Sequence, residues 1–389
     1  MTVSGAGRAT SEERRRLRDD FVRLCEIESP SRRERAIADA ITADLRALGL
    51  EVEEDVSAAE TGADAGNLLA RIHGIDPEAP AILFCAHLDT VPLAAPVEVV
   101  LDGGFLRNRH EAILGADNKV AVATLLGVAR RLAREPARPS VELLFTTCEE
   151  QALLGAKAFD RSRLRAEHGF IFDHASPVGE LILAAPTYYR IQARFRGQAA
   201  HAGLNPEAGH SAIAAAASAI ARLRLGRLDE ETTANVGRIE GGVAANVVPE
   251  HCYVELEARS LDRERAGALV TEIVDELTDA AGAGACDLET EVEEGFRGYR
   301  LTRTAEPVGV AAAALGDLGI EPIYRSTASG SDAAVFNAAG LPCLNLADGS
   351  VDNHRPDERV TVDALETVLD LALRIVAHSG VPGEETTGV

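Results

Sequence analysis

The stretch AILFCAHLD, residues 81–89, begins with six apolar residues and ends in His87, Leu88 and Asp89. Short apolar runs of this kind are typical of strands that are buried on both faces of a sheet. Residues i and i+2 of a strand point the same way, so Asp89 can lie behind the His87 ring and fix its orientation. The stretch therefore predicts a buried strand with an imidazole and a carboxylate at its carboxyl end.

Similar runs occur further along the chain, VELLFTT at 141–147 and GFIFDHA at 169–175. A helical pattern from about Asp117 to Arg134 is apolar on much of its circumference, so we expect it to pack on the sheet. Strands that alternate with helices predict an α/β sheet. The same pattern resumes near the C-terminus. Further helices are expected at 153–159, 305–318, 332–339 and 361–378, with a strand-like run LPCLNLA at 341–347.

Between about residues 186 and 297 the sequence changes character. Strand-like and helical patterns follow one another in the order β-α-β-β-α-β, which is typical of a ferredoxin-like α+β domain. The first helix of this set is expected from Pro206 to Leu225. We predict a three-layer α/β/α domain, residues 1–185 and 298–389, that is interrupted by an inserted ferredoxin-like α+β domain, residues 186–297.

Length and charge limit the classes of function. A chain of 389 residues exceeds a typical single hydrophobic core. The formal net charge of −23 argues against a nucleic-acid partner, because phosphate binding needs clustered Lys and Arg. The basic cluster at 14–18 is interleaved with acidic residues and is interpreted as a solvated helix face rather than a binding arm. No apolar run approaches the roughly 20 residues of a membrane span, and no signal-peptide pattern begins the chain, so we expect a cytoplasmic protein without membrane contact.

The six cysteines are scattered and several lie in apolar runs. This spacing indicates reduced, buried thiols rather than a disulfide framework or a CxxC zinc site. Cys148 is a candidate nucleophile, but its two neighbouring glutamates would raise the pKa of the thiol and suppress the thiolate. A nucleophilic role for Cys148 is therefore disfavoured.

Metal-competent side chains gather where the predicted strands end. The carboxyl edge of an open α/β sheet is where sites form. Mixed histidine and carboxylate ligands suit Zn²⁺, with Mn²⁺ or Co²⁺ as substitutes. The candidates are His87, Asp89, Asp117, Glu149, Glu150, Asp173 and His354.

Each candidate also has an ordinary structural explanation. Asp117 is well placed to cap its helix, and Asp89 precedes a threonine as turn residues do. Glu149 and Glu150 could be a charged strand end, and His87 a hydrogen-bonded core histidine. Their common position at one sheet edge favours a metal site over four separate explanations.

With these residues in place, the sequence resembles the co-catalytic dizinc metallopeptidase family that includes peptidase T, carboxypeptidase G, aminoacylase and succinyl-diaminopimelate desuccinylase. The similarity is greatest to the peptidase T-like branch, through LGADNKV and FDHASPVGEL. It departs from the family pattern at Cys148 and at Gln151-Ala152, which leaves the substrate open. The matching motifs are AHLDTVP (86–92), LGADNKV (114–120), FTTCEE (145–150), FDH (172–174), GQAAHAG (197–203), NVVP (246–249), EARS (257–260), GSDA (330–333) and HRPDE (354–358).

The resemblance implies a role for each candidate residue. Asp117 would bridge two divalent ions, with Zn²⁺ the expected metal and Co²⁺ or Mn²⁺ as alternatives. His87 and Asp173 would complete the shell of one ion. Glu150 and His354 would complete the other. Asp89 would orient His87, and Glu149 would be the general base.

For the inserted domain the resemblance implies a lid and dimerisation role, and so a homodimer. His201 would stabilise the oxyanion, Arg259 would bind a substrate carboxylate, and Asn246 would make a further polar contact. For His201 and Arg259 ordinary surface hydrogen bonding remains the alternative.

The resemblance therefore predicts an aminopeptidase-type di- or tripeptidase that acts on short peptides. The alternative on the same dizinc site is an N-acyl-amino-acid deacylase or a carboxypeptidase. A catalytically silent binding protein is disfavoured by the intact ligands and Glu149. A nucleotide-binding α/β protein is disfavoured because the sequence has no GxGxxG or GxxxxGK[ST] motif.

Overall fold

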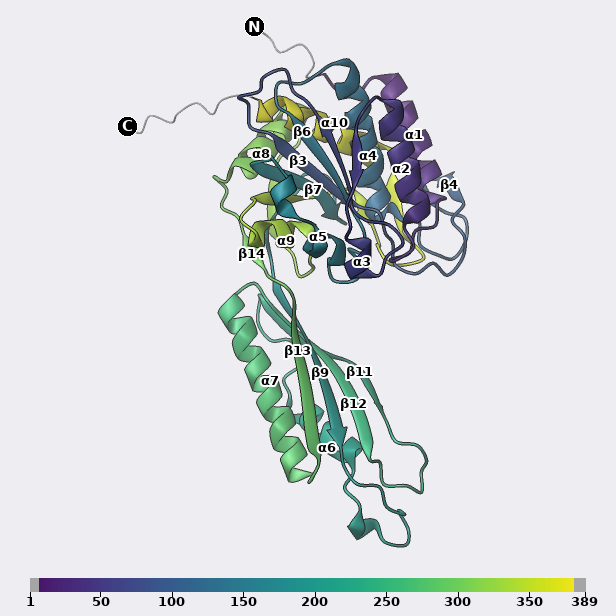
Figure 1. Cartoon of the computed structure of the whole chain (residues 1–389), viewed down its shortest axis with the longest axis vertical. Helices are drawn as coiled ribbons and strands as arrows, with labels where there is room; N and C mark the ends of the chain where they lie inside the picture. Colours follow the sequence, from purple (N-terminus) through teal and green to yellow (C-terminus); the bar gives the residue numbers. More distant parts are fainter. Residues whose placement is uncertain (1–6, 381–389) are drawn as a thin grey trace, which may run out of the picture. The chain divides into compact units, whose positions relative to one another are not determined.

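A computed structural model describes residues 7–380, which form two compact units (Figure 1). The small unit comprises Ala184–Tyr299 and Thr327–Gly330, and the large unit comprises the remaining described residues. The predicted α/β fold with an inserted domain is thus confirmed. The assignment of residues 1–185 and 298–389 to a catalytic domain, and of 186–297 to a lid, stays a prediction.

A nine-stranded mixed sheet forms the centre of the large unit. Its order is β1-β2-β6-β3-β7-β16-β8-β14, with β15 beside β8. Strand β3 is parallel to β6 and β7, and β16 is parallel to β7. The carboxyl ends of these four strands therefore meet at one edge. The strands are β1 Val52–Glu54, β2 Leu68–Ile72, β3 Ile82–His87, β6 Val141–Thr146, β7 His168–His174, β8 Glu180–Ala185, β14 Tyr299–Arg300, β15 Ile323–Ser326 and β16 Cys343–Ala347.

Helices cover both faces of this sheet. Phe84 of β3 belongs to the same buried core as Val120 of α4, whereas the thiol of Cys85 lies 3.8 Å from Asp332 at the start of α9. Successive strand residues point to opposite faces, so α4 and α9 lie on opposite sides, as a three-layer unit requires. The helices are α1 Ser11–Cys25, α2 Arg35–Ala47, α3 Ala58–Thr61, α4 Ala116–Arg134, α5 Leu154–Ala158, α8 Glu306–Leu318, α9 Asp332–Ala338 and α10 Val362–Ser379, with a 3₁₀ turn at Arg161–Arg163.

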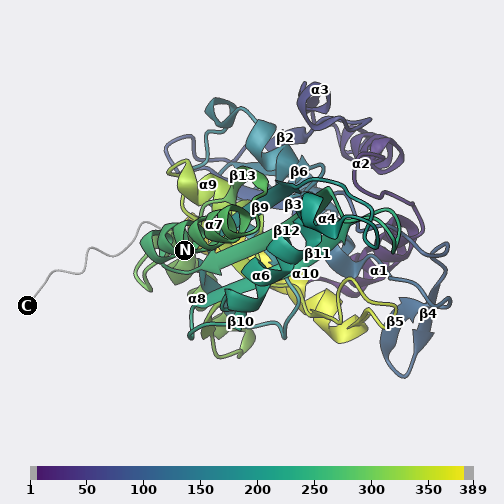
Figure 2. The same cartoon turned by 90° about the horizontal axis from the view of Figure 1, so that it is seen from below.

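The large unit also contains a four-stranded sheet of order β17-β18-β5-β4. Figure 2 shows β4 and β5 as a hairpin at the margin of the large unit. The loop that joins β17 to β18 carries His354, so this sheet places a candidate ligand. Its strands are β4 Val99–Asp102, β5 Phe105–Asn108, β17 Ser350–Val351 and β18 Arg359–Thr361.

The small unit is a five-stranded antiparallel sheet of order β10-β11-β12-β9-β13 with two helices. The helices α6 and α7 share one buried core with the sheet, which includes Ala215, Leu256 and Leu277. Apart from the two-residue strand β10, the elements follow the order β-α-β-β-α-β, which confirms the ferredoxin-like prediction. The elements are β9 Thr187–Arg196, α6 Ala212–Arg222, β10 Gly226–Arg227, β11 Thr232–Gly241, β12 His251–Ser260, α7 Arg263–Ala283 and β13 Asp287–Phe296, with a 3₁₀ turn at Pro206–Ala208.

One predicted helix boundary was wrong. The helix expected from Pro206 begins only at Ala212, because the Ser211 side chain accepts a hydrogen bond from the Ala214 N–H and caps the helix there. Pro206 begins a separate 3₁₀ turn. Within residues 7–380 no helix is long and apolar enough to cross a membrane.

Candidate metal centre

His87 ends β3 with its ring buried. Its Nδ1 lies 2.9 Å from the Asp89 carbonyl oxygen, which can only accept, so Nδ1 carries the proton. The other ring nitrogen, Nε2, faces Asp117 Oδ1 at 3.0 Å and Asp173 Oδ1 at 3.8 Å. A histidine held through Nδ1 in this way presents Nε2 as the nitrogen that can bind a metal.

Asp117 lies between two histidines. Its Oδ1 faces His87, and its Oδ2 lies 3.2 Å from Nε2 of His354. The residue is the second of α4 and has non-helical backbone angles. The partners of its carboxylate are side chains rather than helix N–H groups. The helix-cap explanation therefore does not account for Asp117, whereas a carboxylate shared by two ions would.

Glu150 and His354 form a close pair. Their Oε1 and Nε2 atoms are 2.9 Å apart, yet Glu150 Oε1 is buried and has no partner with hydrogen-bond geometry among the described residues. Two ligand atoms that converge in this way are better placed to bind one cation than to form a hydrogen bond with each other. His354 also has a left-handed backbone, with φ of 63°, which a non-glycine residue keeps only where its surroundings require it.

Glu149 and Asp173 complete the cluster. Ligand atoms of His87, Glu149 and Asp173 lie within 4.8 Å of one another, as do those of His87, Asp117 and Glu150. The carboxylate of Glu149 is thus as close to His87 as a ligand would be.

Buried negative charge dominates the electrostatics. Burial, and then the charge of Asp173, raises the pKa of Glu149 well above its usual range. Burial also raises the pKa of Asp173 and of Glu150. Burial opposes a charge on His87, but the hydrogen bond to Asp117 raises the pKa of that ring. Carboxylates that are crowded and desolvated in this way favour a cation between them, so these residues fit a pair of divalent ions.

Asp89 supports more than the His87 ring. Its Oδ1 accepts the Glu149 N–H at 2.9 Å, and its Oδ2 accepts the Glu150 N–H at 3.1 Å and the Ser31 hydroxyl at 2.6 Å. The ring itself is bonded to the Asp89 backbone carbonyl, and its Nδ1 stands 3.4 Å from the carboxylate. Asp89 therefore positions the histidine and the glutamate pair together.

Four residues near the cluster were not singled out from the sequence. Glu358 and Asn353 bond to the segment that carries Asp117. Asp332 is buried and accepts the Thr146 hydroxyl at 2.6 Å. Asp348 is buried directly after β16 and has one oxygen without a hydrogen-bond partner. The strand-end rule would have found Asp348, and the motifs GSDA and HRPDE already contained Asp332 and Glu358.

The surroundings of Cys148 disfavour a nucleophilic role. Its thiol is fully buried, and burial, with the charges of Glu34 and Asp89, raises the pKa of this thiol to about 12. The thiolate is therefore suppressed at neutral pH. All six cysteines are free, as expected.

The remaining candidates lie in the small unit. His201 is exposed, and its Nδ1 accepts the N–H groups of Gly203 and Leu204 at 3.1 Å each, which leaves Nε2 as a donor in the neutral ring. Arg259 is half-buried against Tyr188, with its guanidinium bonded to Glu257 and to the Ala328 carbonyl. Asn246 is exposed.

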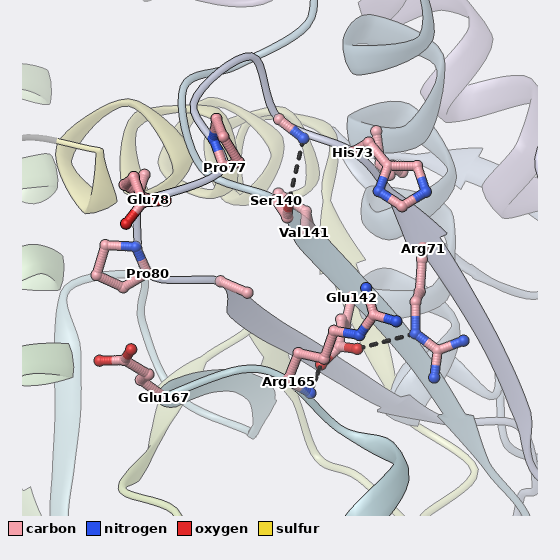
Figure 3. Close-up of a pocket in the computed structure, with 14 residues that line it drawn as sticks. Arg71, His73, Pro77, Glu78, Pro80, Ser140, Val141, Glu142, Arg165 and Glu167 are labelled. Carbon is pink, nitrogen blue, oxygen red and sulfur yellow. Dashed lines mark hydrogen bonds and ion pairs between the residues drawn. The ribbon is translucent and has the colours of Figure 1, made fainter.

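A separate cavity of about 410 Å³ contains none of these residues (Figure 3). It is lined by Ala81, Ser140 and Glu167, which directly precede β3, β6 and β7. The cavity therefore opens at the amino ends of the parallel strands, at the edge of the sheet away from the candidate metal centre. Its buried acid, Glu142, is already bonded to Arg71 and to two backbone N–H groups.

Comparison with known protein families gives two matches. A family model described as a peptidase dimerisation domain matches residues 188–285, and one described as peptidase family M28 matches residues 67–224. The first match falls within the small unit. The second spans β2 to α6 and includes all the candidate ligands except His354.

Similar proteins match along nearly the whole chain. The uncharacterized protein YqjE of Bacillus subtilis is 34% identical over 366 residues, which cover 94% of this chain and 98% of the relative. The structure of the aminopeptidase PepT from Bacillus cereus is 35% identical with a TM-score of 0.86. That of a tripeptidase from Staphylococcus aureus is 32% identical with a TM-score of 0.90. Both alignments cover 94% of this chain and 98% of the other chain.

Proposed function

The chain belongs to the dinuclear metallopeptidase family that includes peptidase T, and we propose that it is an aminopeptidase that removes the N-terminal residue of di- and tripeptides. The observation that carries this proposal is the Asp117 carboxylate, whose two oxygens face His87 and His354 separately. The names of the similar aminopeptidase and tripeptidase support the choice of free short peptides as substrates.

In this proposal His87, Asp117 and Asp173 hold one ion, and Asp117, Glu150 and His354 hold the other. Zinc suits these nitrogen and oxygen ligands, with cobalt or manganese as substitutes. When bound, such a pair of ions polarises the scissile carbonyl and lowers the pKa of a shared water towards about 7.

Glu149 then acts as the general base. Its carboxylate lies beside His87 and Asp173, and no ligand role is needed for it once the five other residues are assigned. It takes a proton from the attacking water and returns it to the leaving amine, a transfer that is typically worth about 10²–10⁴-fold in rate. Asp89 keeps the Glu149 backbone and the His87 ring in place during this step.

The small unit supplies the substrate contacts in this proposal. The neutral His201 ring presents Nε2–H as a donor, as stabilisation of an oxyanion requires. Arg259 would bind a substrate carboxylate in place of its present partner Glu257, and Asn246 would add a polar contact. The match to a peptidase dimerisation domain supports a homodimer through this unit. The cytoplasmic location stays a prediction.

The test is an assay of the metal-loaded enzyme against free tripeptides and the same tripeptides with blocked N-termini. We expect release of the N-terminal residue from the free peptides only, detected by mass spectrometry. Turnover of the blocked peptides without turnover of the free ones would reject the aminopeptidase and support the deacylase or carboxypeptidase alternative.

A further inference from the structure

We propose that Glu358 is a positioning residue that fixes the backbone beneath Asp117 and thereby sets the affinity of the centre for its ions. The inference rests on the proposed metal centre, but it concerns a residue that binds no ion and touches no substrate in that proposal. Glu358 lies in the loop between β17 and β18, and its side chain is only 1% exposed.

Three backbone N–H groups converge on this carboxylate. Oε2 accepts the N–H groups of Leu114 and Gly115, each at 2.8 Å, and Oε1 accepts the N–H of Asp117 at 3.0 Å. These bonds span the segment where the chain enters α4, and Asp117 itself departs there from helical backbone angles. Because that segment makes no regular helical turn, Glu358 supplies the acceptors that would otherwise be missing.

The same loop also carries His354, so one segment provides a candidate ligand and holds another. The Glu358 N–H bonds to the Arg355 carbonyl at 3.0 Å, which closes a turn directly after His354. Asn353, on the other side of the histidine, donates from Nδ2 to Asp117 Oδ2 at 3.1 Å. The loop therefore holds Asp117 at two points, its backbone through Glu358 and its carboxylate through Asn353. Both contacts fix the distance between Asp117 and His354.

Replacement of Glu358 by glutamine breaks this arrangement with almost no change in shape. An amide has one acceptor oxygen and one NH₂ donor. If its oxygen faces Asp117, the NH₂ group opposes the N–H groups of Leu114 and Gly115. If the amide is reversed, the NH₂ group opposes the N–H of Asp117. Either orientation pushes the segment away and moves Asp117 from its place between the imidazoles.

Glu142 offers a matched control. It is also buried, at 2% exposure, and its carboxylate also takes three donors: the N–H groups of Arg165 and Ala166 and Nε of Arg71. It lies near the amino end of β6, whereas the candidate centre lies at the carboxyl end of that strand. Glu142→Gln thus creates the same donor conflict in the same unit, away from the ions.

The experiment measures Zn²⁺ binding to metal-free protein by competition with a chromophoric chelator, and the visible absorption of the Co²⁺-loaded protein. We expect Glu358→Gln to weaken Zn²⁺ binding about 10–100-fold and to change the Co²⁺ spectrum, while Glu142→Gln keeps wild-type affinity and spectrum. Wild-type affinity in a folded Glu358→Gln protein, or equal weakening in Glu142→Gln, would overturn the proposal.

Should Glu358→Gln fail to fold by circular dichroism, Glu358→Asp takes its place. Aspartate keeps both acceptor oxygens but is one methylene too short to reach all three donors. Weaker Zn²⁺ binding is then expected, and unchanged binding contradicts the proposal. A wild-type protein that binds two ions but cleaves no peptide would reject the proposed function and leave the role of Glu358 standing.

Discussion

Asp89 shows how much of the centre depends on a residue that binds no ion in the proposed assignment. Its carboxylate accepts the N–H groups of Glu149 and Glu150, and its carbonyl accepts the His87 Nδ1–H. Cys148, just before the glutamate pair, has a left-handed φ of 52°, and its N–H bonds to buried Glu34. The two glutamates are therefore held in a fixed turn and can take different roles.

The division of roles between these glutamates is testable. Glu149→Ala is expected to lower kcat about 10²–10⁴-fold with metal content unchanged, because it removes only the proton acceptor. Glu150→Ala is expected to lower kcat and also to lose part of the bound metal. Metal analysis beside steady-state kinetics checks both. Equal metal loss in the two variants would show that Glu149 is a ligand, as its distance from His87 allows.

His201 carries the second prediction at this scale. His201→Ala is expected to lower kcat about 10²–10³-fold, since it removes the Nε2–H donor proposed for the oxyanion. Metal content and thermal stability are expected to stay at wild-type values, because the ring is exposed. His210→Ala, in the same loop, is the control and should keep wild-type kinetics. Full activity of the His201→Ala variant would reject the proposed role of this ring in stabilising the oxyanion.

Among the elements, the two ends of the parallel strands differ in the residues that they carry. His87, the glutamate pair and Asp173 lie at or just beyond the carboxyl ends, whereas the amino ends carry no candidate ligand. His168 begins β7 with a buried ring that packs edge-on against Phe170 at 5.5 Å. Its Nε2 has no hydrogen-bond partner among the described residues, so a charge on this ring would be poorly solvated.

This burial makes the large unit sensitive to acid. Burial lowers the pKa of His168 from 6.5 to about 4. As the pH falls below 6.5 the unfolded chain takes up the proton first, so stability falls between pH 6.5 and 4 and then levels off. The full loss is on the order of 3 kcal/mol.

Replacement of this histidine should therefore reduce the loss of stability in acid. The free energy of unfolding of the metal-free protein is measured with urea between pH 6.5 and 4. His168→Phe is expected to make it depend less on pH in this range, whereas His73→Phe, at an exposed site, should leave the dependence unchanged. Parallel curves for His168→Phe and the wild type would refute this.

The strands and the positions of the candidate ligands could be predicted because their signals are local. Apolar runs such as ILFCAH mark buried strands, and the residues at their ends share an edge as soon as the strands are parallel. The contacts of Glu358 and Asn353 with the Asp117 segment could not be predicted in this way. They join positions about 240 residues apart in sequence, and only the packed sheet brings those positions together.

Helix starts were harder to predict than strands. The helix expected at Pro206 begins at Ala212, since the Ser211 side chain caps it there.

The roles of the candidate ligands were inferred from the family resemblance. The geometry supports these roles, because the imidazoles of His87 and His354 face different oxygens of Asp117. The spacing of these residues in the sequence does not predict that arrangement.

In the whole molecule, a net charge of −23 is combined with a buried cluster of carboxylates. Such a cluster destabilises the metal-free fold by repulsion and stabilises the loaded one, because an ion that binds only the folded chain shifts the folding equilibrium. Metal content, stability and activity are therefore expected to change together. In our proposal the small unit adds both the substrate contacts and the contact with a partner chain.

The most direct test of the two-metal account is a titration of metal-free enzyme with Zn²⁺ in which bound ions per chain and the rate of free-tripeptide cleavage are measured on the same samples. We predict no cleavage in the metal-free protein and a rate that reaches its maximum at two ions per chain. Full activity in the metal-free protein, or a maximum at one ion with no second ion bound, would contradict the account.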